Sequence, residues 1–281
     1  MKKEVTVDMT KGRIAPQILK FAMPVLLGLI FQRIYNFADS WIVGHFLGDN
    51  ALAAVSVAGV GMYLVFSVII GLTTGVTVVM SQYYGAKQED KVVETFFSSI
   101  YIALAMTVIV TVAGVLLSRP LLILLQTPDE VLNEAVWYLQ LICAGSVGTM
   151  LYNWISSVLR SLGNSVVPLI FLGISSALNV VLDILLVAVI PLGVGGAAIA
   201  TVLAQLISGG ACLVYAWKIL PMLRFQRSKM KLNRYIGKQM LVYGLPAALQ
   251  MSIISISDMT LQAVVNTYGT TLVVAYGVCV K

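Results

Sequence analysis

Residues 100–117 read IYIALAMTVIVTVAGVLL and contain no charged side chain. A stretch of this length and polarity can cross the hydrocarbon core of a membrane as an α-helix, which takes about 20 apolar residues. The stretch lacks period-two alternation and is longer than a strand, so it predicts a helix rather than a barrel strand. Similar stretches recur along the chain, and together they predict an all-α polytopic membrane protein.

The composition agrees with a membrane protein and argues against several soluble classes. Of the 281 residues, 59% are hydrophobic and 11% are charged, and the mean hydropathy is +0.94. Soluble domains are about 45–50% apolar and about 25% charged. The charged side chains are too few to cover a soluble globule, so a soluble enzyme, a disordered protein and a coiled coil are all disfavoured.

The sequence carries no motif for catalysis or cofactor binding. It has no phosphate-binding lysine loop, no histidine and cysteine cluster with metal-ligand spacing, and no nucleophile elbow. The three cysteines lie in apolar runs without ligand spacing. We therefore predict that the protein is not an enzyme and needs no cofactor.

Apolar runs bounded by charged or turn residues predict seven complete membrane spans and the start of an eighth. The seven lie near residues 14–43, 52–80, 92–117, 132–158, 165–190, 194–217 and 241–267, and the eighth begins near residue 272. The segment Thr127-Pro-Asp-Glu130 predicts a capping box that starts the fourth span. The run 121–125 before it is too short to span and is predicted to lie at the interface.

The basic residues orient the spans. Of the 18 Lys and Arg residues, 15 fall in the N-terminal segment and in the connections after the second, fourth and sixth spans, whereas the opposite loops hold only Arg119. By the positive-inside rule, the N-terminus is predicted to lie in the cytoplasm, with the chain in the inner (plasma) membrane. The net charge of +6 then reflects topology, and no nucleic-acid partner is predicted.

The seventh span repeats the first. Tyr243-Gly-Leu-Pro246 matches Phe21-Ala-Met-Pro24, and Gly269 follows the second copy as Gly48 follows the first. Six spans separate the copies, so both run in the same direction, as in transporters built from parallel repeats. We expect a six-helix N-terminal lobe over residues 1–219, a basic cytoplasmic linker over 220–240 and the start of a second lobe over 241–281.

The repeat length gives an expectation about the whole protein. The two copies lie about 221 residues apart, so two complete repeats need roughly 440 residues, and the chain has 281. A truncated protein is therefore predicted. The alternative is a natural half-protein that dimerises.

Four ionisable side chains fall at membrane depth, namely Arg33, Asp39, Asp183 and Asp258. Each costs about 2.5–3.5 kcal/mol on insertion scales and therefore needs a reason to be there. Other polar residues share helical faces with Asp39 and Asp183 or fall on the fourth and sixth spans. Together with Asp258 they are the candidate cavity-lining set: Gln32, Tyr35, Asn36, Asn153, Ser176, Asn179, Thr201 and Gln205. The alternative for the hydroxyl residues is that they join helices by hydrogen bonds.

The predicted chemistry centres on Asp39 and Asp183, which lie at similar depth in spans that run in the same direction. A low-dielectric cavity disfavours the charged form of a carboxylate, and a second carboxylate nearby adds to this, so the pair can hold a proton or Na⁺ and exchange it for a cationic substrate. Asn179, one turn from Asp183, is a further ligand candidate. Pro24 predicts a bend in the first span. No partner is predicted for Arg33.

Taken together, these motifs resemble the multidrug and toxic compound extrusion (MATE) family of the MOP superfamily. The resemblance covers nearly the whole chain and rests on Pro24, Tyr35-Asn-Phe-Ala-Asp39, Gly44-His-Phe-Leu-Gly48, Ser81-Gln-Tyr-Tyr-Gly85-Ala86, Leu159-Arg-Ser-Leu-Gly163-Asn-Ser165 with Pro168, Leu178-Asn-Val-Val-Leu-Asp183, and Gly193-Val-Gly-Gly-Ala-Ala-Ile-Ala-Thr201. It implies twelve helices in two lobes that alternate access, and a monomer among membrane lipids. It also implies multidrug efflux, an antiport of small organic cations or other amphipathic substrates against H⁺ or Na⁺.

The resemblance also assigns roles to residues. Asp39, Asp183, Asn179 and Thr201 match the family's cation-coupling positions, and Pro24 matches the proline at which the first helix is proposed to bend. Two alternatives stay open at this point. One is a lipid-linked oligosaccharide flippase of the same superfamily, for which a basic rather than an acidic cavity is expected. The other is a non-transporting fragment.

Overall fold

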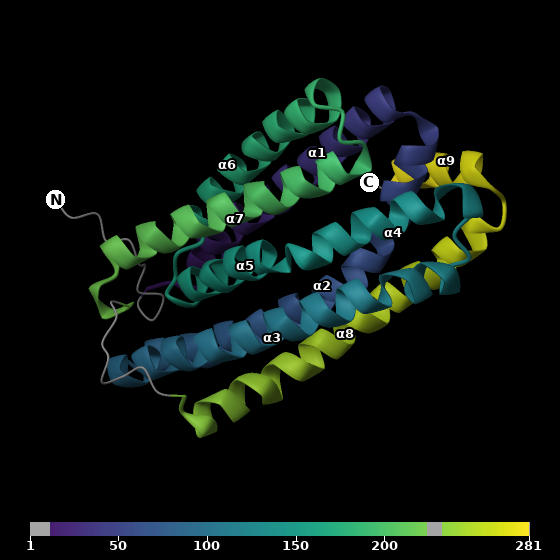
Figure 1. Ribbon diagram of the computed structural model, residues 1–281. Coiled ribbons are helices and arrows are strands. Elements are labelled where there is room, and N and C mark those ends of the chain that lie inside the picture. Colours follow the sequence, from purple (N-terminus) through teal and green to yellow (C-terminus); the bar gives the residue numbers. More distant parts are fainter. Residues whose placement is uncertain (1–11, 224–231, 281) are drawn as a thin grey trace.

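The computed structural model describes residues 12–223 and 232–280, and these residues form helices and connecting turns without a strand (Figure 1). The helices are α1 (Ile14–Leu47), α2 (Asp49–Gly85), α3 (Glu89–Leu124), α4 (Asp129–Ala144), α5 (Ser146–Ser161), α6 (Val166–Asp183), a π-helix η1 (Ile184–Val189), α7 (Val194–Ile219), a short 3₁₀ turn η2 (Pro221–Leu223), α8 (Arg234–Asn266) and α9 (Thr270–Val280).

The lengths and hydropathy of these helices confirm a multi-pass membrane protein. Six are long and apolar enough to cross a membrane, where α6 and η1 together count as one, and the pair α4 and α5 makes a seventh if it is one span bent by 48°. Each predicted span coincides with one of these units, and α9 lies where the eighth span was predicted to begin. Apolar runs thus located every helix, because the bilayer forces spans to be long and apolar.

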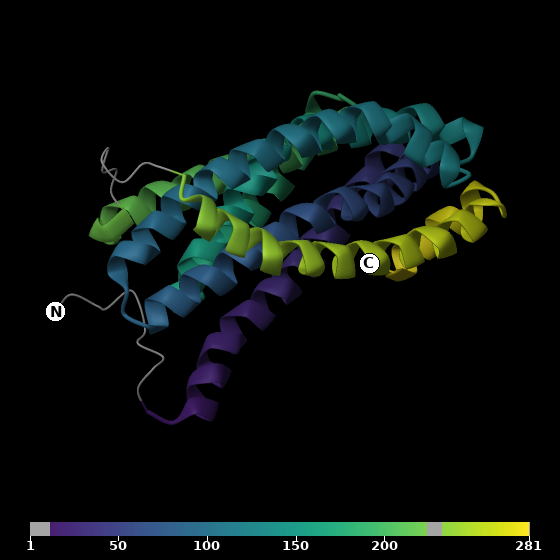
Figure 2. The same cartoon turned by 90° about the horizontal axis from the view of Figure 1, so that it is seen from below.

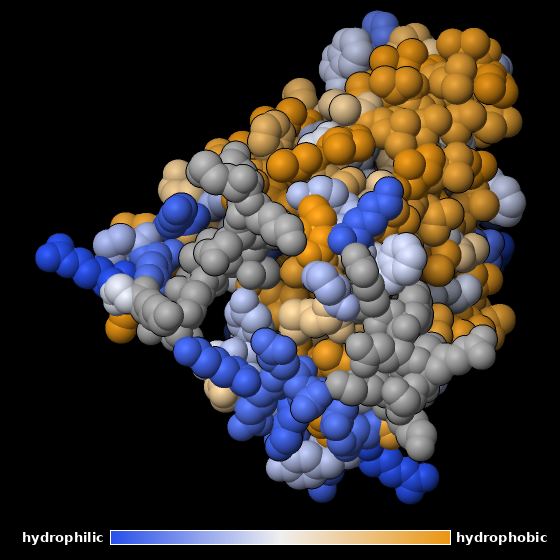
Figure 3. All heavy atoms as spheres, turned by 90° about the vertical axis from the view of Figure 1, so that its left-hand side faces the viewer, coloured by the Kyte–Doolittle hydropathy of each residue, from blue (hydrophilic) through white to orange (hydrophobic). Residues whose placement is uncertain are grey.

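Charge is segregated between the two ends of the bundle. One end, which we call the basic end, holds the start of α1, the α2–α3, α5–α6 and α7–α8 connections, and described basic residues such as Lys87, Lys91, Arg160, Lys218 and Arg234. Figure 3 looks onto this end and shows hydrophilic side chains gathered there, with hydrophobic side chains along the flank. Arg119 lies at the opposite end of the bundle, near the C-terminal end of α3.

The helices pack as an elongated bundle around the bent pair α4–α5. This pair contacts α2, α3 and α7, while α6 packs between α1 and α7 (Figure 1). The hydrophobic core is formed by residues such as Val57, Leu139 and Ile155, which are buried between these helices. Seen from below in Figure 2, α8 runs along α2, and α9 folds back at the far end of α8.

The contact between α2 and α8 is unusually close because small residues face one another. A Cβ atom on Gly71 would overlap the backbone of Ala248, and one on Gly75 would overlap Gly244. Small residues spaced four apart allow such close backbone approach in membranes. One turn away, the hydroxyls of Ser67 and Ser252 lie 2.8 Å apart and share a hydrogen bond.

The turns after the two repeated spans share one backbone geometry. Gly48 joins α1 to α2 with φ 87°, and Gly269 joins α8 to α9 with φ 89°. Only glycine adopts such values without strain, which explains why the sequence repeat includes this pair. Both helices before these glycines continue through an internal proline, Pro24 in α1 and Pro246 in α8.

The capping box predicted between the third and fourth spans was wrong. The hydroxyl of Thr127 donates to the carbonyl of Leu122 (2.7 Å), and α4 starts at Asp129 without a side-chain cap. Thr127 thus satisfies a free carbonyl near the end of α3 instead of a free N–H of α4. The run 121–125 continues the third span, because α3 extends to Leu124 and the side chains of Leu122 and Leu125 are buried; its place at the interface stays a prediction.

The predicted linker over 220–240 is shorter than expected where the structure describes it. Residues 224–231 lie outside the described residues, but Arg234 already begins α8. The side chain of Asn233 caps this helix, since its Oδ1 accepts from the backbone N–H groups of Tyr235 (3.0 Å) and Ile236 (3.3 Å). The first turns of α8 carry charge and therefore looked like a loop in the sequence.

Candidate functional site

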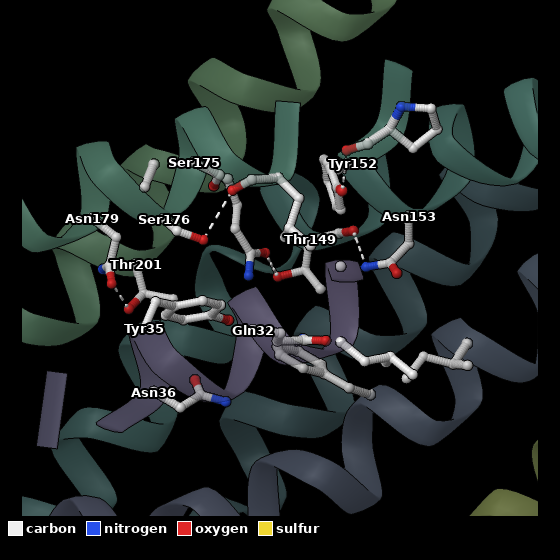
Figure 4. A pocket seen from close by; sticks show the side chains of 18 of the residues that line it. Gln32, Tyr35, Asn36, Thr149, Tyr152, Asn153, Ser175, Ser176, Asn179 and Thr201 are labelled. Carbon is white, nitrogen blue, oxygen red and sulfur yellow. Dashed lines mark hydrogen bonds between the residues drawn. The ribbon is translucent and has the colours of Figure 1, made fainter. Parts of the chain in front are cut away.

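A cavity of about 210 Å³ lies among α1, α2, α4, α5, α6 and α7 (Figure 4). Its lining combines apolar and aromatic side chains with a set of polar ones. The lining contains Pro24 and most of the polar residues singled out in the sequence, namely Gln32, Tyr35, Asn36, Asp39, Asn153, Ser176, Asn179, Thr201 and Gln205. None of the described residues of α8 or α9 lines it.

Helical spacing explains the contribution of α1. Pro24, Gly28, Gln32, Tyr35 and Asp39 are separated by three or four residues and therefore share one face of the helix. From Pro24 to Asp39 the lining face extends about 22 Å along the helix axis. The cavity is thus long and runs along the bundle.

Asp39 lines one end of this cavity, whereas Asp183 is buried behind the wall and is not among the lining residues. Asp39 of α1 is 8% exposed and Asp183, the last residue of α6, is fully buried. The two carboxyl groups are close enough to act on each other electrostatically. Two carboxyl groups this close cannot both stay charged in a low-dielectric site without a bound proton or cation between them.

The neighbours of Asp183 leave part of its carboxylate available. Among the described residues none hydrogen-bonds to Asp183 Oδ1, although this atom is buried. Oδ2 accepts from Asn179 Nδ2 at 3.2 Å when the Asn179 amide is oriented to satisfy both of its ends. The Asn179 oxygen then accepts from the hydroxyl (3.2 Å) and the backbone N–H (3.3 Å) of Thr201, so α7 fixes the amide (Figure 4).

A change of helix type occurs directly after Asp183. Residues Ile184–Val189 form a π-helix, which continues α6 with wider turns. Such π segments are rare and occur mostly at functional sites, because the extra residue redirects side chains. The apolar run 165–190 did not reveal this change, since α- and π-helices bury the same kinds of residue.

A second polar group lies nearer the middle of the cavity. Thr149 of α5 donates its hydroxyl to Gln205 Oε1 of α7, and Asn153 donates to the Thr149 carbonyl (2.8 Å; Figure 4). The Tyr152 hydroxyl donates to the carbonyl of Pro168 (3.0 Å). These bonds tie α5 to α6 and α7 across the cavity wall.

Some lining residues were not selected from the sequence. Tyr63, Tyr138, Tyr152 and Ser175 line the cavity although none was a candidate. Tyr138 is buried in α4, four residues from the apolar Ile142 on the same face. A tyrosine inside a predicted span could have identified these lining positions in the sequence, because a buried tyrosine hydroxyl needs a hydrogen-bond partner.

Two of the ionisable residues at membrane depth lie elsewhere. Asp258 is exposed on α8 and is not among the residues that line this cavity, so its part in a substrate path stays a prediction. α8 packs against the bundle through residues that include Ser255, Met259 and Gln262, which are buried, and Asp258 lies at the exposed edge of this face. Arg33 is exposed on α1 and is also absent from the lining.

The donor set fits a proton or a hard cation. The carboxylates of Asp39 and Asp183, the amide of Asn179 and the hydroxyl of Thr201 offer oxygen ligands, which such cations prefer. In the part of the chain that the structure describes, no three His, Cys, Asp or Glu residues cluster as a metal site. A transition-metal centre therefore has no support among these residues.

The family model MatE matches residues 24–185, which is more than half of the chain and includes α1 through the cavity-lining part of α6. The chain belongs to the MATE family. It is similar to the probable multidrug resistance proteins YpnP (35% identity over 273 residues, 96% of this chain and 60% of the relative) and YoeA (28% over 281 residues, 98% and 61%) of Bacillus subtilis strain 168.

The fold matches that of solved MATE structures. A crystal structure of MATE in the bent conformation superimposes with a TM-score of 0.84 at 25% identity, covering 98% of this chain and 61% of that one. The chain spans about 60% of the length of the curated MATE relatives it matches. The described helices correspond to that shared part of the MATE fold.

Proposed function

We propose that this chain serves in secondary active multidrug efflux, in which organic cations or other amphipathic drugs are exported in exchange for H⁺ or Na⁺. The observation that carries the proposal is the carboxyl group of Asp39 in the lining of a cavity within the membrane-spanning bundle, with the buried carboxyl group of Asp183 acting on it. Such a pair favours one neutralising cation at a time. Because the coupling ion and the organic cation compete for the same carboxylates, release of one accompanies binding of the other, which is the physical basis of antiport.

Individual residues have distinct parts in this proposal. Asp39 and Asp183 bind the coupling ion, and Asn179 and Thr201 complete its oxygen ligands if the ion is Na⁺. The remaining polar side chains of the cavity, such as Tyr35 and Gln205, contact the substrate. A bend at Pro24 changes the access of this site, because a proline within a helix removes one backbone hydrogen bond.

The relatives support efflux as the transport direction, since YpnP and YoeA carry the name of probable multidrug resistance proteins. The proposed unit that holds the site is the six-helix lobe of residues 1–219, and residues 241–281 begin a second lobe related by the repeat. The complete protein is proposed to be a monomer of twelve helices, with the basic end of the bundle in the cytoplasm.

The proposal is tested by uptake into proteoliposomes that contain the chain. Uptake of tetraphenylphosphonium is measured under an imposed pH or Na⁺ gradient for the wild type, Asp39→Asn, Asp183→Asn and Asp258→Asn. Asp258→Asn is the matched control, because it removes an acid at membrane depth outside the cavity. We expect gradient-driven uptake by the wild type and the control only. Uptake at the wild-type rate in both cavity variants, or none by the wild type under either gradient, would contradict the proposal.

A further inference from the structure

The cavity contains one charged group that the proposed antiport does not use. Arg160, in the last turn of α5, lines the cavity and is half-buried. It lies at the basic end, where a tight turn joins α5 to α6 and Gly163 N–H donates to the Arg160 carbonyl (3.0 Å). Asp183 is at the other end of α6, about 27 Å along the axis from Ser165. The cavity is therefore acidic at one end and basic at the other.

No acid neutralises Arg160 within the described part of the chain. The titratable neighbour that acts on it is the Tyr152 hydroxyl, and no carboxylate of the described residues is among the groups that act on it. A guanidinium presents five N–H donors and keeps its charge in proteins. Removing it from water is costly unless an anion or water satisfies these donors. Arg160 thus brings to this end of the cavity a positive charge that no carboxylate of the described residues offsets.

The surroundings of Arg160 also favour an anion. Ser165 lines the same end of the cavity and precedes the first residue of α6, and its side chain is buried. The positive end of the α6 dipole points to this region. Asn164 Oδ1 already accepts from Val167 N–H (3.0 Å), which fixes the start of the helix beside the cavity. A guanidinium, a hydroxyl and a helix N-terminus are together the donors that recognise carboxylate and phosphate oxygens.

The middle of the cavity suits the body of an amphipathic molecule. Leu29, Phe66, Ile69 and Leu172 line it between the two charged ends, and polar groups there are already hydrogen-bonded to the protein. Ligand sites commonly combine such apolar walls with a few placed polar groups. An anion bound at Arg160 can therefore carry an apolar or aromatic group that extends towards Asp39.

We propose that the basic end of the cavity, centred on Arg160 with Ser165, is an oxyanion site that holds the carboxylate or phosphate of an amphipathic ligand. The inference rests on the proposed use of this cavity for substrates. It adds an anion-binding subsite at the end of the cavity opposite the cation-binding carboxylates. A phosphate at this site can come from a lipid headgroup or from a soluble molecule. Both sources present the same oxygens to the guanidinium, so the test separates them.

Binding of 1-naphthyl phosphate to the full chain tests the site. Fluorescence anisotropy is measured in nanodiscs of phosphatidylcholine for the wild type, Arg160→Gln, Arg160→Lys and Arg119→Gln. Arg119→Gln removes the same charge at the opposite end and is the matched control. We expect Arg160→Gln to weaken binding at least about tenfold, because charge-assisted hydrogen bonds are lost, with Arg160→Lys closer to the wild type. Equal affinities of Arg160→Gln and the wild type would overturn the proposal.

A measurement on the wild type covers the case in which Arg160→Gln does not fold. Phenylglyoxal modifies accessible arginines, and mass spectrometry locates the modified positions. We expect 1-naphthyl phosphate to slow modification of Arg160 but not of Arg119. Equal rates at Arg160 with and without the probe would refute the site. Adding phosphatidylglycerol to the nanodiscs protects Arg160 by itself if a lipid headgroup is the natural occupant, and leaves the rate unchanged if the occupant is soluble.

The anion-binding end at Arg160 and the cation-binding end at Asp39 and Asp183 are tested separately. 1-Naphthylmethylammonium has the same ring system as the first probe and a positive charge. Asp183→Asn should weaken its binding and leave binding of 1-naphthyl phosphate unchanged, whereas Arg160→Gln should have the reverse pattern. If Arg160→Gln does not weaken binding of 1-naphthyl phosphate, the oxyanion site is refuted. If Asp183→Asn does not weaken binding of 1-naphthylmethylammonium, the proposed coupling pair is refuted.

Discussion

A substitution at Gly75 tests whether α2 and α8 pack as closely as the structure places them. A Cβ atom on Gly75 would lie 2.8 Å from the backbone N and 2.9 Å from the Cα of Gly244, and closer still to the carbonyl oxygen of Met240. Favourable contacts between such atoms are about 3.5–4.0 Å long, so Gly75→Val forces the helices apart by about 1 Å. Overpacking of this kind costs about 1–3 kcal/mol, and backbone atoms cannot move aside as a flexible side chain can.

The expected loss is measurable as a shift in thermal stability. For about 2–3 kcal/mol and a chain of this size, the apparent midpoint should fall by roughly 4–10 °C. Heating in detergent followed by size-exclusion chromatography gives the midpoint. Gly59→Val is the control on the same helix, because nothing lies within 4 Å of a Cβ at Gly59. Equal midpoints for the two valine variants would refute the close α2–α8 contact.

Three further predictions concern other contacts. The double variant Ser67→Cys/Ser252→Cys should form a disulfide under mild oxidation, seen as altered mobility after proteolysis between the two positions, because the native hydroxyls lie 2.8 Å apart. Trp154→Phe should lower the free energy of unfolding by about 1 kcal/mol, measured as a lower melting midpoint, since its indole donates to a buried serine hydroxyl of α3 (2.8 Å). Asn266→Leu should lower the free energy of unfolding by about 1–3 kcal/mol in the same assay, because it leaves the buried Leu125 carbonyl without its donor (2.7 Å). An unchanged midpoint in either of these two variants would contradict the hydrogen bond that it removes.

The helices could be predicted from the sequence because the bilayer restricts the alternatives. Each apolar run became one span or a bent pair, and the glycine repeat coincided with two turns of equal φ, at Gly48 and Gly269. Interruptions within spans were less visible. The bend at Gly145 between α4 and α5 interrupts one apolar run, and a hydropathy pattern does not distinguish a straight span from a bent one.

The cavity could be predicted where polar residues share a helical face. Gln32, Tyr35 and Asp39 follow the helical period, and the structure places them on one cavity wall. Asp258 also follows the helical period, with Ser255 three residues before it and Gln262 four residues after it, yet its side chain is exposed and does not line this cavity. Depth in the membrane alone therefore did not identify a cavity residue, because depth does not determine the direction of a side chain.

The geometry around Asp183 and Arg160 needed the structure. The π-helix after Asp183 contacts α1 and α7, and no residue type marks it in the sequence. Arg160 counted among the basic residues that orient the chain, and its place in the cavity wall depends on the turn between α5 and α6. Long-range contacts decide such features, whereas local patterns decide the helices.

Competition between ions at the carboxyl pair tests the central claim most directly. The dissociation constant of tetraphenylphosphonium is measured for the purified chain as a function of pH and of Na⁺ concentration, for the wild type, Asp183→Asn and Asp258→Asn. In the wild type and in Asp258→Asn, a tenfold rise in the coupling ion should weaken binding by up to about tenfold, by linkage at a shared site. In Asp183→Asn this dependence should disappear. Binding that ignores both ions in the wild type, or that keeps its ion dependence in Asp183→Asn, would contradict the account.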